Sequence, residues 1–460
     1  MKSEISFDYK NTLSSAVGFE GLDATHLNTR AALEAVRTLQ RRAAAGKLGF
    51  AELPNDRATL KAVIEFAEKM RPAIDVVLLI GIGGSALGAH ALDLAVRGPR
   101  PLQTDSAGRG RTKGSMPMLV VLDNIDPGTM AAALEKFNPR RTAACVITKS
   151  GSTAETMATF LIVHEWLQAA LGKRTRERIV AITDPQEGDL LAIAKKERYQ
   201  LFFIPRNVGG RFSVLSAAGL VPAALVGLDV RKLLRGAADA NALCWQESLE
   251  ANPALASATV HHALDTTKDK KIEVVFAYSS YLWGAAYWYC QLWAESLGKE
   301  IDRKGRKVEA GQTPVPALGV TDQHSQLQLY MEGPRDKMIT FWTAERSRAE
   351  VRIPRAFSEY DSCKYLGGRK LSELFRAERI ATEAALTQAG RPNCRWTLPW
   401  LDEYTLGAFL QMLEFQTAFA GELYNLDAFD QPGVELAKTL TYSLMGRQGY
   451  QQYARRLRVS

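Results

Sequence analysis

Two short apolar runs, each followed at once by a loop of small residues, constrain the fold of this chain most. The first run is Val76–Ile80, and the loop after it reads GIGGSALG over residues 81–88. The second run is Ala144–Ile147, and it leads into TKSGSTAET at 148–156. Short apolar runs without polar alternation are typical of parallel strands buried on both faces. The pattern therefore predicts two parallel strands, each of which turns sharply into a helix.

Loops of this kind are suited to binding an anion. They direct backbone N–H groups and small hydroxyls toward a helix N-terminus, where negative charge is favoured. The first loop lacks the Gly-x-Gly-x-x-Gly spacing of dinucleotide folds, and neither loop has the Gly-Lys-Ser/Thr ending of a P-loop. Hydroxyls in place of lysine fit a monophosphate better than a triphosphate. Each loop could instead be a tight turn that needs glycine, with Ser or Thr as a helix cap. The pair together favours a phosphorylated ligand held from two sides.

The composition excludes several other classes of protein. Of the 460 residues, 46% are hydrophobic and 23% are charged, which is ordinary for a globular chain. The formal net charge is +8, and the basic residues are dense only in the Gly/Pro/Ser-rich stretch 97–113, which is typical of an exposed loop. The sequence contains no apolar run of about 18 residues and no hydrophobic signal core. We therefore expect a cytoplasmic protein that binds neither membrane nor nucleic acid.

Cysteine and histidine usage bears on metals and cofactors. The five cysteines are scattered and include no Cys-x-x-Cys pair, so neither a disulfide framework nor a zinc cluster is predicted. A His-x-x-x-His pair is also absent from the sequence. We expect neither a metal ion nor a redox cofactor.

Strand-like and helix-like stretches alternate along most of the chain. In the first half, strands are predicted at 75–80, 118–123, 143–147, 178–183 and 201–204. A second series begins with a strand at 271–278, continues with an aromatic helix over about 281–297, and includes a strand at 338–342. Residues 1–70 are predicted to be mostly helical, with helices at 30–45 and 57–70. Helix is also predicted over 212–250 and from about 368 onward.

This alternation favours parallel sheets that are covered by helices on both faces. The predicted fold class is therefore α/β, with two doubly wound parallel sheets and flanking N- and C-terminal helices. The predicted boundaries are a helical segment at 1–69, a first α/β domain at 70–228, a second at 229–440 and a C-terminal helix at 441–460.

Two charged residues stand where chemistry is expected. Arg211 lies in a glycine turn after a predicted strand, on the side of a parallel sheet where ligands bind. It could stabilise an oxyanion, or it could be a structural arginine that bonds main-chain carbonyls. Glu295 lies late in the apolar helix, where a carboxylate is unfavourable unless it is partnered or used. It could be a general base, or it could pair with Lys299 at i,i+4.

Two further residues have both a chemical and a simpler interpretation. His324 follows Thr321 and Asp322, either of which would cap a helix and place the imidazole in its first turn. It could equally be a surface histidine at a helix start. Lys438 lies in DQPGVELAK, where it could form a surface pair with Glu435 at i,i+3.

The joint occurrence of these motifs is more specific than any one of them. The stretches GIGGSALG, TKSGSTAET, NVGGRFS, AESLGK, TDQHSQ and DQPGVELAK, in this order and spacing, resemble the phosphoglucose isomerase family. The similarity runs from about residue 75 to 440, and GGRFS and DQPGVELAK are its most specific parts. The chain departs from the family at Thr148 and Ser150, where Ser and Thr are often found, and at Pro432, where a large aromatic is common.

The resemblance implies two sugar-isomerase (SIS) domains and a role for each site residue. Glu295 would move a proton between C1 and C2 of a sugar phosphate, and Arg211 would stabilise the cis-enediolate. His324 and Lys438 would assist ring opening, and Gln431 would hydrogen-bond the sugar or the phosphate. The residues implied in binding the phosphate are Gly84, Ser85, Thr148, Lys149, Ser150, Gly151 and Thr153.

The resemblance also implies a homodimer in which the histidine reaches the active site of the neighbouring subunit. The expected reaction interconverts glucose 6-phosphate and fructose 6-phosphate, without cofactor or metal. Two alternatives stay open from the sequence. One is a relaxed isomerase that also accepts mannose 6-phosphate, and the other is a non-catalytic regulator that only binds sugar phosphates.

Overall fold

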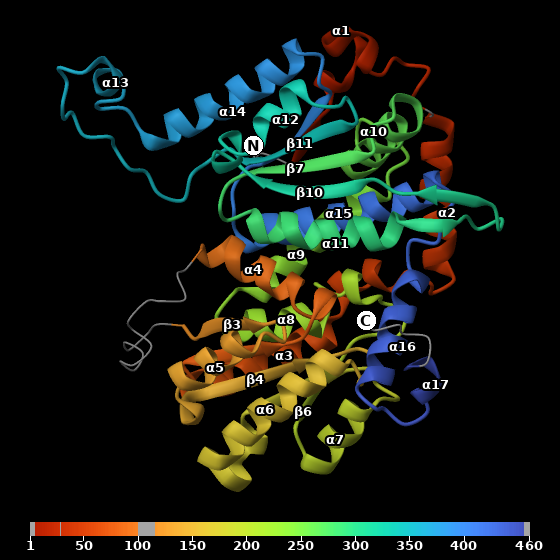
Figure 1. Ribbon diagram of the computed structural model, residues 1–460, viewed down its shortest axis with the longest axis vertical. Coiled ribbons are helices and arrows are strands. Elements are labelled where there is room, and N and C mark those ends of the chain that lie inside the picture. The colour runs from red at the N-terminus through yellow and green to blue at the C-terminus, as the bar shows by residue number, and fades with distance from the viewer. Residues whose placement is uncertain (1–4, 28, 100–115, 455–460) are drawn as a thin grey trace.

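The computed structural model describes residues 5–27, 29–99 and 116–454 (Figure 1). Two five-stranded sheets lie one above the other, with a layer of helices between them and further helices on both outer faces. Most of the basic stretch 97–113 lies outside the described residues. Among the described residues, no helix is both long and apolar enough to span a membrane.

The first sheet is wholly parallel, as predicted. Its strand order is β3-β2-β4-β5-β6. Its strands are β2 (Val76–Ile80), β3 (Met118–Leu122), β4 (Thr142–Ile147), β5 (Ile179–Thr183) and β6 (Gln200–Phe203). The chain leaves β2 toward β3 on one side and returns to β4 on the other. The loops that follow β2 and β4 therefore meet at the point where the strand order reverses, which is the ligand position in open parallel sheets.

Strand β2 explains why an uninterrupted apolar run predicts a strand that is buried on both faces. All five of its residues are buried. Val77 and Leu79 join the core between the sheets, whereas Val76, Leu78 and Ile80 pack into the outer core. Because helices cover both faces, the strand has no polar alternation.

The helices connect and cover the strands. In the first half they are α1 (Ser14–Val17), α2 (Thr29–Ala44), α3 (Arg57–Met70), α4 (Leu87–Arg97), α5 (Pro127–Lys136), α6 (Ala154–Leu171), α7 (Asp189–Glu197) and α8 (Ala217–Leu225). In the second half they are α9 (Val230–Cys244), α10 (Pro253–Lys268), α11 (Trp283–Leu297), α12 (Leu327–Glu332), α13 (Asp361–Lys364), α14 (Leu371–Gln388), α15 (Glu403–Leu423), α16 (Glu435–Leu444) and α17 (Gln451–Ala454). The predicted helix over 212–250 is divided into α8 and α9 by the turn between them.

The second sheet is mixed, which corrects the prediction of a wholly parallel one. Its order is β1-β12-β11-β7-β10, and only β1 runs antiparallel to its neighbour. Its strands are β1 (Ser6–Asp8), β7 (Ile272–Tyr278), β10 (Thr313–Leu318), β11 (Lys337–Ala344) and β12 (Asn393–Leu398). A separate hairpin joins β8 (Lys299–Ile301) to β9 (Lys307–Ala310).

Three strands of this sheet were not predicted. The expectation of continuous helix from about 368 is wrong at β12, which lies inside the sheet. Strand β10 carries Pro314 and Pro316, which disfavour strands except at a sheet edge, and β10 is an edge strand. Strand β1 spans three residues, too few for a period to show.

Helix α15 lies at the centre of the layer between the sheets. It packs against α2, α4, α9, α10 and α11, and every residue from Thr405 to Gly421 is buried. One of these buried residues, Glu414, is acidic. Neither carboxyl oxygen of Glu414 has a hydrogen-bond partner in the described part of the chain. Burial raises the pKa of Glu414 well above its ordinary value.

A buried acid with a raised pKa makes stability depend on pH. The contribution of Glu414 to folding is fully present below its unfolded pKa and is lost as the pH rises toward the folded value. The loss is on the order of 1 kcal/mol for each pH unit within that window. Glu414→Gln stays neutral at every pH. In urea unfolding, we therefore expect its free energy of unfolding to exceed that of the parent by more at pH 8 than at pH 5.

A second glutamate of α15 provides the control. Glu422 is partnered by Arg42 and Arg303, so Glu422→Gln removes charge pairing and is expected to destabilise the fold at both pH values. A difference between Glu414→Gln and the parent that did not change from pH 5 to pH 8 would contradict the assignment of a neutral, buried acid.

Candidate active site

The two glycine- and hydroxyl-rich loops lie side by side, because they follow the neighbouring strands β2 and β4. The first loop continues as a 3₁₀ turn at Gly83–Ser85 and then as α4, and the second leads into α6. At Gly81 an added Cβ would lie 3.2 Å from the main-chain oxygen of Ile147. The two loops are therefore in contact at their bases, which places both helix N-termini at one location.

Three hydroxyls of the second loop gather in front of α6. The Thr148 Oγ1 lies 3.0 Å from Thr153 Oγ1 and 3.4 Å from Ser150 Oγ, and Ser150 Oγ lies 3.2 Å from Thr153 Oγ1. Thr153 precedes the first residue of α6, yet its side chain makes no capping hydrogen bond. Its hydroxyl points into the cluster, so the helix-cap interpretation does not describe it. We call Thr148, Ser150 and Thr153 the hydroxyl cluster.

Glycines in both loops are required by the backbone. Gly151 has φ +69° and packs against Gly188, with an added Cβ only 2.8 Å from the Gly188 Cα. At Gly84 an added Cβ would lie 2.3 Å from the Gly210 oxygen, so the first loop touches the turn that carries Arg211. Half-buried Ser85 ends this loop's 3₁₀ turn. The tight-turn interpretation is therefore correct for these glycines, and it coexists with the hydroxyl cluster.

The side chain of Lys149 is engaged in supporting the neighbouring segment. Its Nζ donates to the main-chain oxygens of Arg206 and Val208, at 2.9 and 2.7 Å. Burial lowers the pKa of Lys149. The lysine thus ties the second loop to the segment that leads into Arg211.

Arg211 is the charged centre of the site, and its side chain is 1% exposed. Its Nη2 donates to the main-chain oxygens of Ala428 and Asp430, at 2.5 and 2.9 Å. Its Nη1 donates to Gln431 Oε1 at 2.5 Å and lies 3.5 Å from Glu295 Oε2. Burial lowers the pKa of Arg211, and the charge of Glu295 acts in the opposite direction. Arg211 is therefore both a structural arginine that bonds carbonyls and the neighbour of a carboxylate.

Glu295 lies in the last turn of α11, and 31% of its side chain is exposed. Its Oε1 accepts a hydrogen bond of 3.1 Å from Gln291 Nε2. The predicted pair with the Lys299 ammonium does not form, because Lys299 Nζ instead donates to the main-chain oxygen of Glu295 and to Asp430. The carboxylate is thus held by one amide and one guanidinium and remains open to a ligand.

Gln291 is a site residue that we did not predict. It lies one helical turn before Glu295, and its Nε2 is 2.7 Å from where a Cβ of Gly83 would stand. It therefore joins the first loop to the carboxylate. Its spacing of four residues from Glu295 on a buried helix is the signal that could have identified it.

His324 is exposed and does not begin a helix, which corrects the predicted capping. Thr321 and Asp322 lie within a 3₁₀ turn, Thr321–Gln323, and His324 follows it. Asp322 Oδ2 accepts from the Leu318 N–H at 2.7 Å, so this carboxylate fixes the end of β10. Helix α12 begins after Gln326.

His324 and Glu295 lie near opposite ends of strand β10. Strands β7 and β10 are parallel, and α11 runs from the carboxyl end of β7 back to the start of β10 (Figure 1). At Gly311, just before β10, an added Cβ would lie 2.8 Å from the Leu297 oxygen, which places the end of α11 there. His324 follows the other end of β10. Strand β10 has six residues, so its two ends are about 15–20 Å apart.

Lys438 forms the surface pair that its spacing allows. Its Nζ donates to Glu435 Oε1 at 2.7 Å, and its side chain is 46% exposed. It lies on α16, which follows Gln431 after a short 3₁₀ turn that begins at Pro432. The structure thus joins Arg211, Glu295 and Gln431, gathers the hydroxyl cluster nearby, and leaves His324 and Lys438 without contact to either group.

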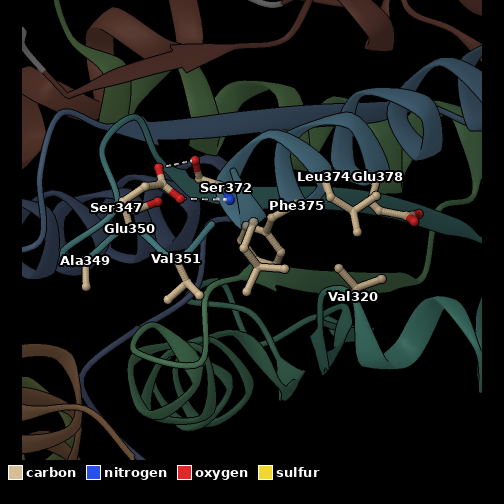
Figure 2. A pocket seen from close by; sticks show the side chains of 10 residues that line it. Val320, Ser347, Ala349, Glu350, Val351, Ser372, Leu374, Phe375 and Glu378 are labelled. Atoms are coloured by element: carbon tan, nitrogen blue, oxygen red, sulfur yellow. Dashed lines mark hydrogen bonds between the residues drawn. The ribbon is translucent and has the colours of Figure 1, made fainter. Parts of the chain in front are cut away.

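A cavity of about 440 Å³ lies elsewhere, and Val320, which precedes the 3₁₀ turn Thr321–Gln323, is among its lining residues (Figure 2). It is lined by the chain at 347–351, the start of α14 and Val320. Figure 2 shows two of the lining residues joined by hydrogen bonds, which Ser372 donates to the Glu350 carboxylate. None of the predicted site residues lines this cavity. Within the described residues, no group of three or more His, Cys, Asp or Glu side chains is placed to hold a metal ion.

Comparison with known proteins identifies the family. The model of the family described as "Phosphoglucose isomerase" matches residues 61–453. The glucose-6-phosphate isomerase of Carboxydothermus hydrogenoformans is 44% identical, over 91% of this chain and 89% of that protein. The enzyme of the same name from Rubrobacter xylanophilus is 43% identical, over 97% and 99%. The crystal structure of a hypothetical protein from Thermus thermophilus covers 96% of this chain and 99% of its own, with a TM-score of 0.83 and 37% identity. This chain therefore belongs to the phosphoglucose isomerase family.

Proposed function

We propose that this chain is a glucose-6-phosphate isomerase, which interconverts glucose 6-phosphate and fructose 6-phosphate in glycolysis and gluconeogenesis. One observation carries the proposal: a partly exposed carboxylate, Glu295, lies 3.5 Å from the buried guanidinium of Arg211, next to loops suited to a phosphate. An aldose–ketose isomerase needs a base between two adjacent carbons and a cation at the neighbouring oxygen. The glucose-6-phosphate isomerases to which the chain is similar support the same substrates.

The phosphate is bound by the two loops at the reversal point of the first sheet. The hydroxyl cluster donates hydrogen bonds to its oxygens, and Ser85 and Gly84 contribute from the first loop. Main-chain N–H groups around Lys149 and Gly151 complete the site. The start of α6 adds a favourable field, because a helix N-terminus attracts an anion.

Glu295 then acts as the base. With glucose 6-phosphate in its open form, it removes the proton from C2, the electron pair forms the C1–C2 double bond, and the C1 oxygen takes the negative charge. The Arg211 guanidinium stabilises this cis-enediolate. A proton passes from the C2 hydroxyl to the C1 oxygen, and return of the carried proton to C1 then gives fructose 6-phosphate, with the carbonyl at C2. Gln291 orients the carboxylate through its hydrogen bond of 3.1 Å. Gln431, held by Arg211, hydrogen-bonds the sugar or the phosphate.

Ring opening needs a second acid–base pair, which we assign to His324 and Lys438. The separation of His324 from Glu295 by the length of β10 supports a site shared between two copies of this chain. A homodimer supplies the partner's histidine to each Glu295. Each chain comprises two sugar-isomerase domains at 70–228 and 229–440, flanked by 1–69 and 441–460, although the N-terminal segment contributes β1 to the second sheet. The role in glycolysis assigns the enzyme to the cytoplasm.

A direct assay tests the proposal. Turnover of fructose 6-phosphate and of mannose 6-phosphate is measured side by side, each coupled to a reporter of its product. We expect fast formation of glucose 6-phosphate from fructose 6-phosphate. Saturable binding of these sugar phosphates without any turnover would support a non-catalytic regulator instead.

The hydroxyl cluster is tested by removing two of its members. We expect Ser150→Ala with Thr153→Val to raise KM for fructose 6-phosphate on the order of 100-fold, because each hydrogen bond to a charged group contributes about 1.5–3 kcal/mol. Ser152→Ala is the matched control, since it removes a hydroxyl of the same loop outside the cluster, and its KM should stay within about twofold. An unchanged KM in the double variant would show that the phosphate does not bind at this loop.

The chemical step is tested by isotope exchange. A base that meets solvent lets part of the carried hydrogen exchange, so turnover of fructose 6-phosphate in D₂O should place deuterium at C2 of the glucose 6-phosphate formed. Glu295→Gln keeps the shape and removes the proton acceptor. Its kcat and its exchange should both fall by at least about 10²–10⁴-fold, with phosphate binding retained. Product free of deuterium at early turnover would exclude this mechanism.

The shared site is tested by mixing two inactive proteins. Glu295→Gln and His324→Ala each disable a different half of the proposed site. After subunit exchange, a hybrid dimer would contain one site with both groups intact, so we expect activity to return toward about a quarter of the parent level in an equal mixture. Exchange demonstrated by a tagged subunit, without recovery of activity, would mean that each site is built within one chain.

A further inference from the structure

Lys299 is a buried cation for which the proposed mechanism has no use. It begins β8, directly after α11, and its side chain is 7% exposed. Its Nζ donates to the Glu295 main-chain oxygen at 2.7 Å and to the Asp430 main-chain oxygen at 2.8 Å, and it lies 3.3 Å from Asp430 Oδ1. An ammonium has three N–H donors, and three acceptors surround it here.

Each of these acceptors belongs to a segment that carries a site residue. Glu295 itself supplies one main-chain oxygen, from the last turn of α11, where a cation is also favoured by the helix dipole. The other acceptors belong to Asp430, whose neighbour Gln431 hydrogen-bonds Arg211. We call residues 428–431 the Gln431 segment. Lys299 therefore joins the end of the helix that carries the base to the Gln431 segment.

Arg211 bonds the same segment from another direction. Its Nη2 donates to the main-chain oxygens of Ala428 and Asp430, so the Asp430 oxygen accepts hydrogen bonds from two cations. Beyond this point the chain is weakly packed, since residues 430–438 are exposed. The two cations therefore provide polar contacts that hold the Gln431 segment against the body of the protein.

Placing two cations side by side is unfavourable in itself. Burial lowers the pKa of Lys299, the charge of Arg211 lowers it further, and Asp430 acts in the opposite direction. A neutral side chain would avoid this repulsion, but it would remove the ammonium donor from the Glu295 main-chain oxygen and leave the Asp430 main-chain oxygen with Arg211 alone. A polar group left without a partner at a buried site is unfavourable.

We propose that Lys299 is a positioning residue of the isomerase: it fixes the last turn of α11, which carries Glu295, to the segment that presents Gln431. The inference rests on the proposed function, since Glu295 and Gln431 acquire their roles there. The three acceptors of Lys299 are protein oxygens, so this residue is assigned no contact with the sugar. It acts through the position of the Glu295 carboxylate relative to the ligand that Gln431 contacts, because proton transfer depends steeply on the distance from the base to the reacting carbon.

The first test replaces the ammonium by an apolar side chain of similar length. We expect Lys299→Met to lower kcat for fructose 6-phosphate by roughly 10–100-fold, because a displacement of about 1 Å costs up to 10²-fold. KM should change much less than kcat, because the phosphate loops follow β2 and β4 and only the Gln431 contact with the ligand depends on Lys299. Lys299→Arg retains donors and should recover most of the lost kcat.

A matched control separates positioning from a general loss of stability. Lys270 is also buried, with 1% of its side chain exposed, and its Nζ donates to Glu20 Oε2 and to the Arg335 main-chain oxygen, both at 2.5 Å. Lys270→Met removes a cation with similar bonding away from the site. We expect it to lower the Tm while kcat, measured well below the Tm, stays within about twofold.

The second test asks whether Lys299 acts through the Gln431 segment. If it does, Lys299→Met should lower kcat much less in a Gln431→Ala background than in the parent, with a coupling of at least about fivefold. Lys270→Met should combine with Gln431→Ala multiplicatively. Multiplicative effects for Lys299→Met, or a loss of kcat that is matched by Lys270→Met, would overturn the proposal. A parent enzyme without isomerase turnover would refute the proposed function instead, so the two failures are distinguishable.

Discussion

The guanidinium of Arg211 is a buried charge whose partners come from separate parts of the chain. Ser296 and Glu295 belong to the end of α11, and Ala428, Asp430 and Gln431 belong to the segment before α16. A cation with 1% exposure is tolerated only when its donors are paired, and removing a partner leaves an uncompensated buried charge. Folding the chain therefore requires these two parts to meet at the turn that carries Arg211, and their meeting brings Glu295, the proposed base, together with Arg211 and the Gln431 amide.

Much of the fold could be predicted, because burial on both faces leaves a clear signal in the sequence. Strands β2 and β4 lie under helices on either side, so their apolar runs are uninterrupted and end where the loops of small residues begin. The unpredicted strands lack that signal for physical reasons. Strand β10 tolerates Pro314 and Pro316 because it is an edge, and β12 contains Asn393 and Arg395, whose side chains hydrogen-bond neighbouring segments.

The site was predictable where residues adjoin in sequence and less so where they meet in space. Thr148, Ser150 and Thr153 occupy one loop, and their clustering follows from the turn before α6. Local sequence offered no sign that Lys299 would reach across to Asp430 rather than pair with the Glu295 carboxylate, since that choice depends on where a segment 131 residues away is placed. His324 is the extreme case, because the length of β10 separates it from Glu295.

The arrangement divides the site into a rigid part and an exposed part, and the chemistry explains the division. Glu295 projects from α11, which packs against α4 and α15 in the core between the sheets, and α4 continues the first loop. The proposed removal of a proton from carbon needs Glu295 and Arg211 at fixed distances, and this packing favours such an arrangement. Lys438 and His324 lie on exposed turns and helices instead. Ring opening exchanges protons between oxygens, which solvent and small movements accommodate readily. The residues proposed for that step can therefore stand on exposed elements.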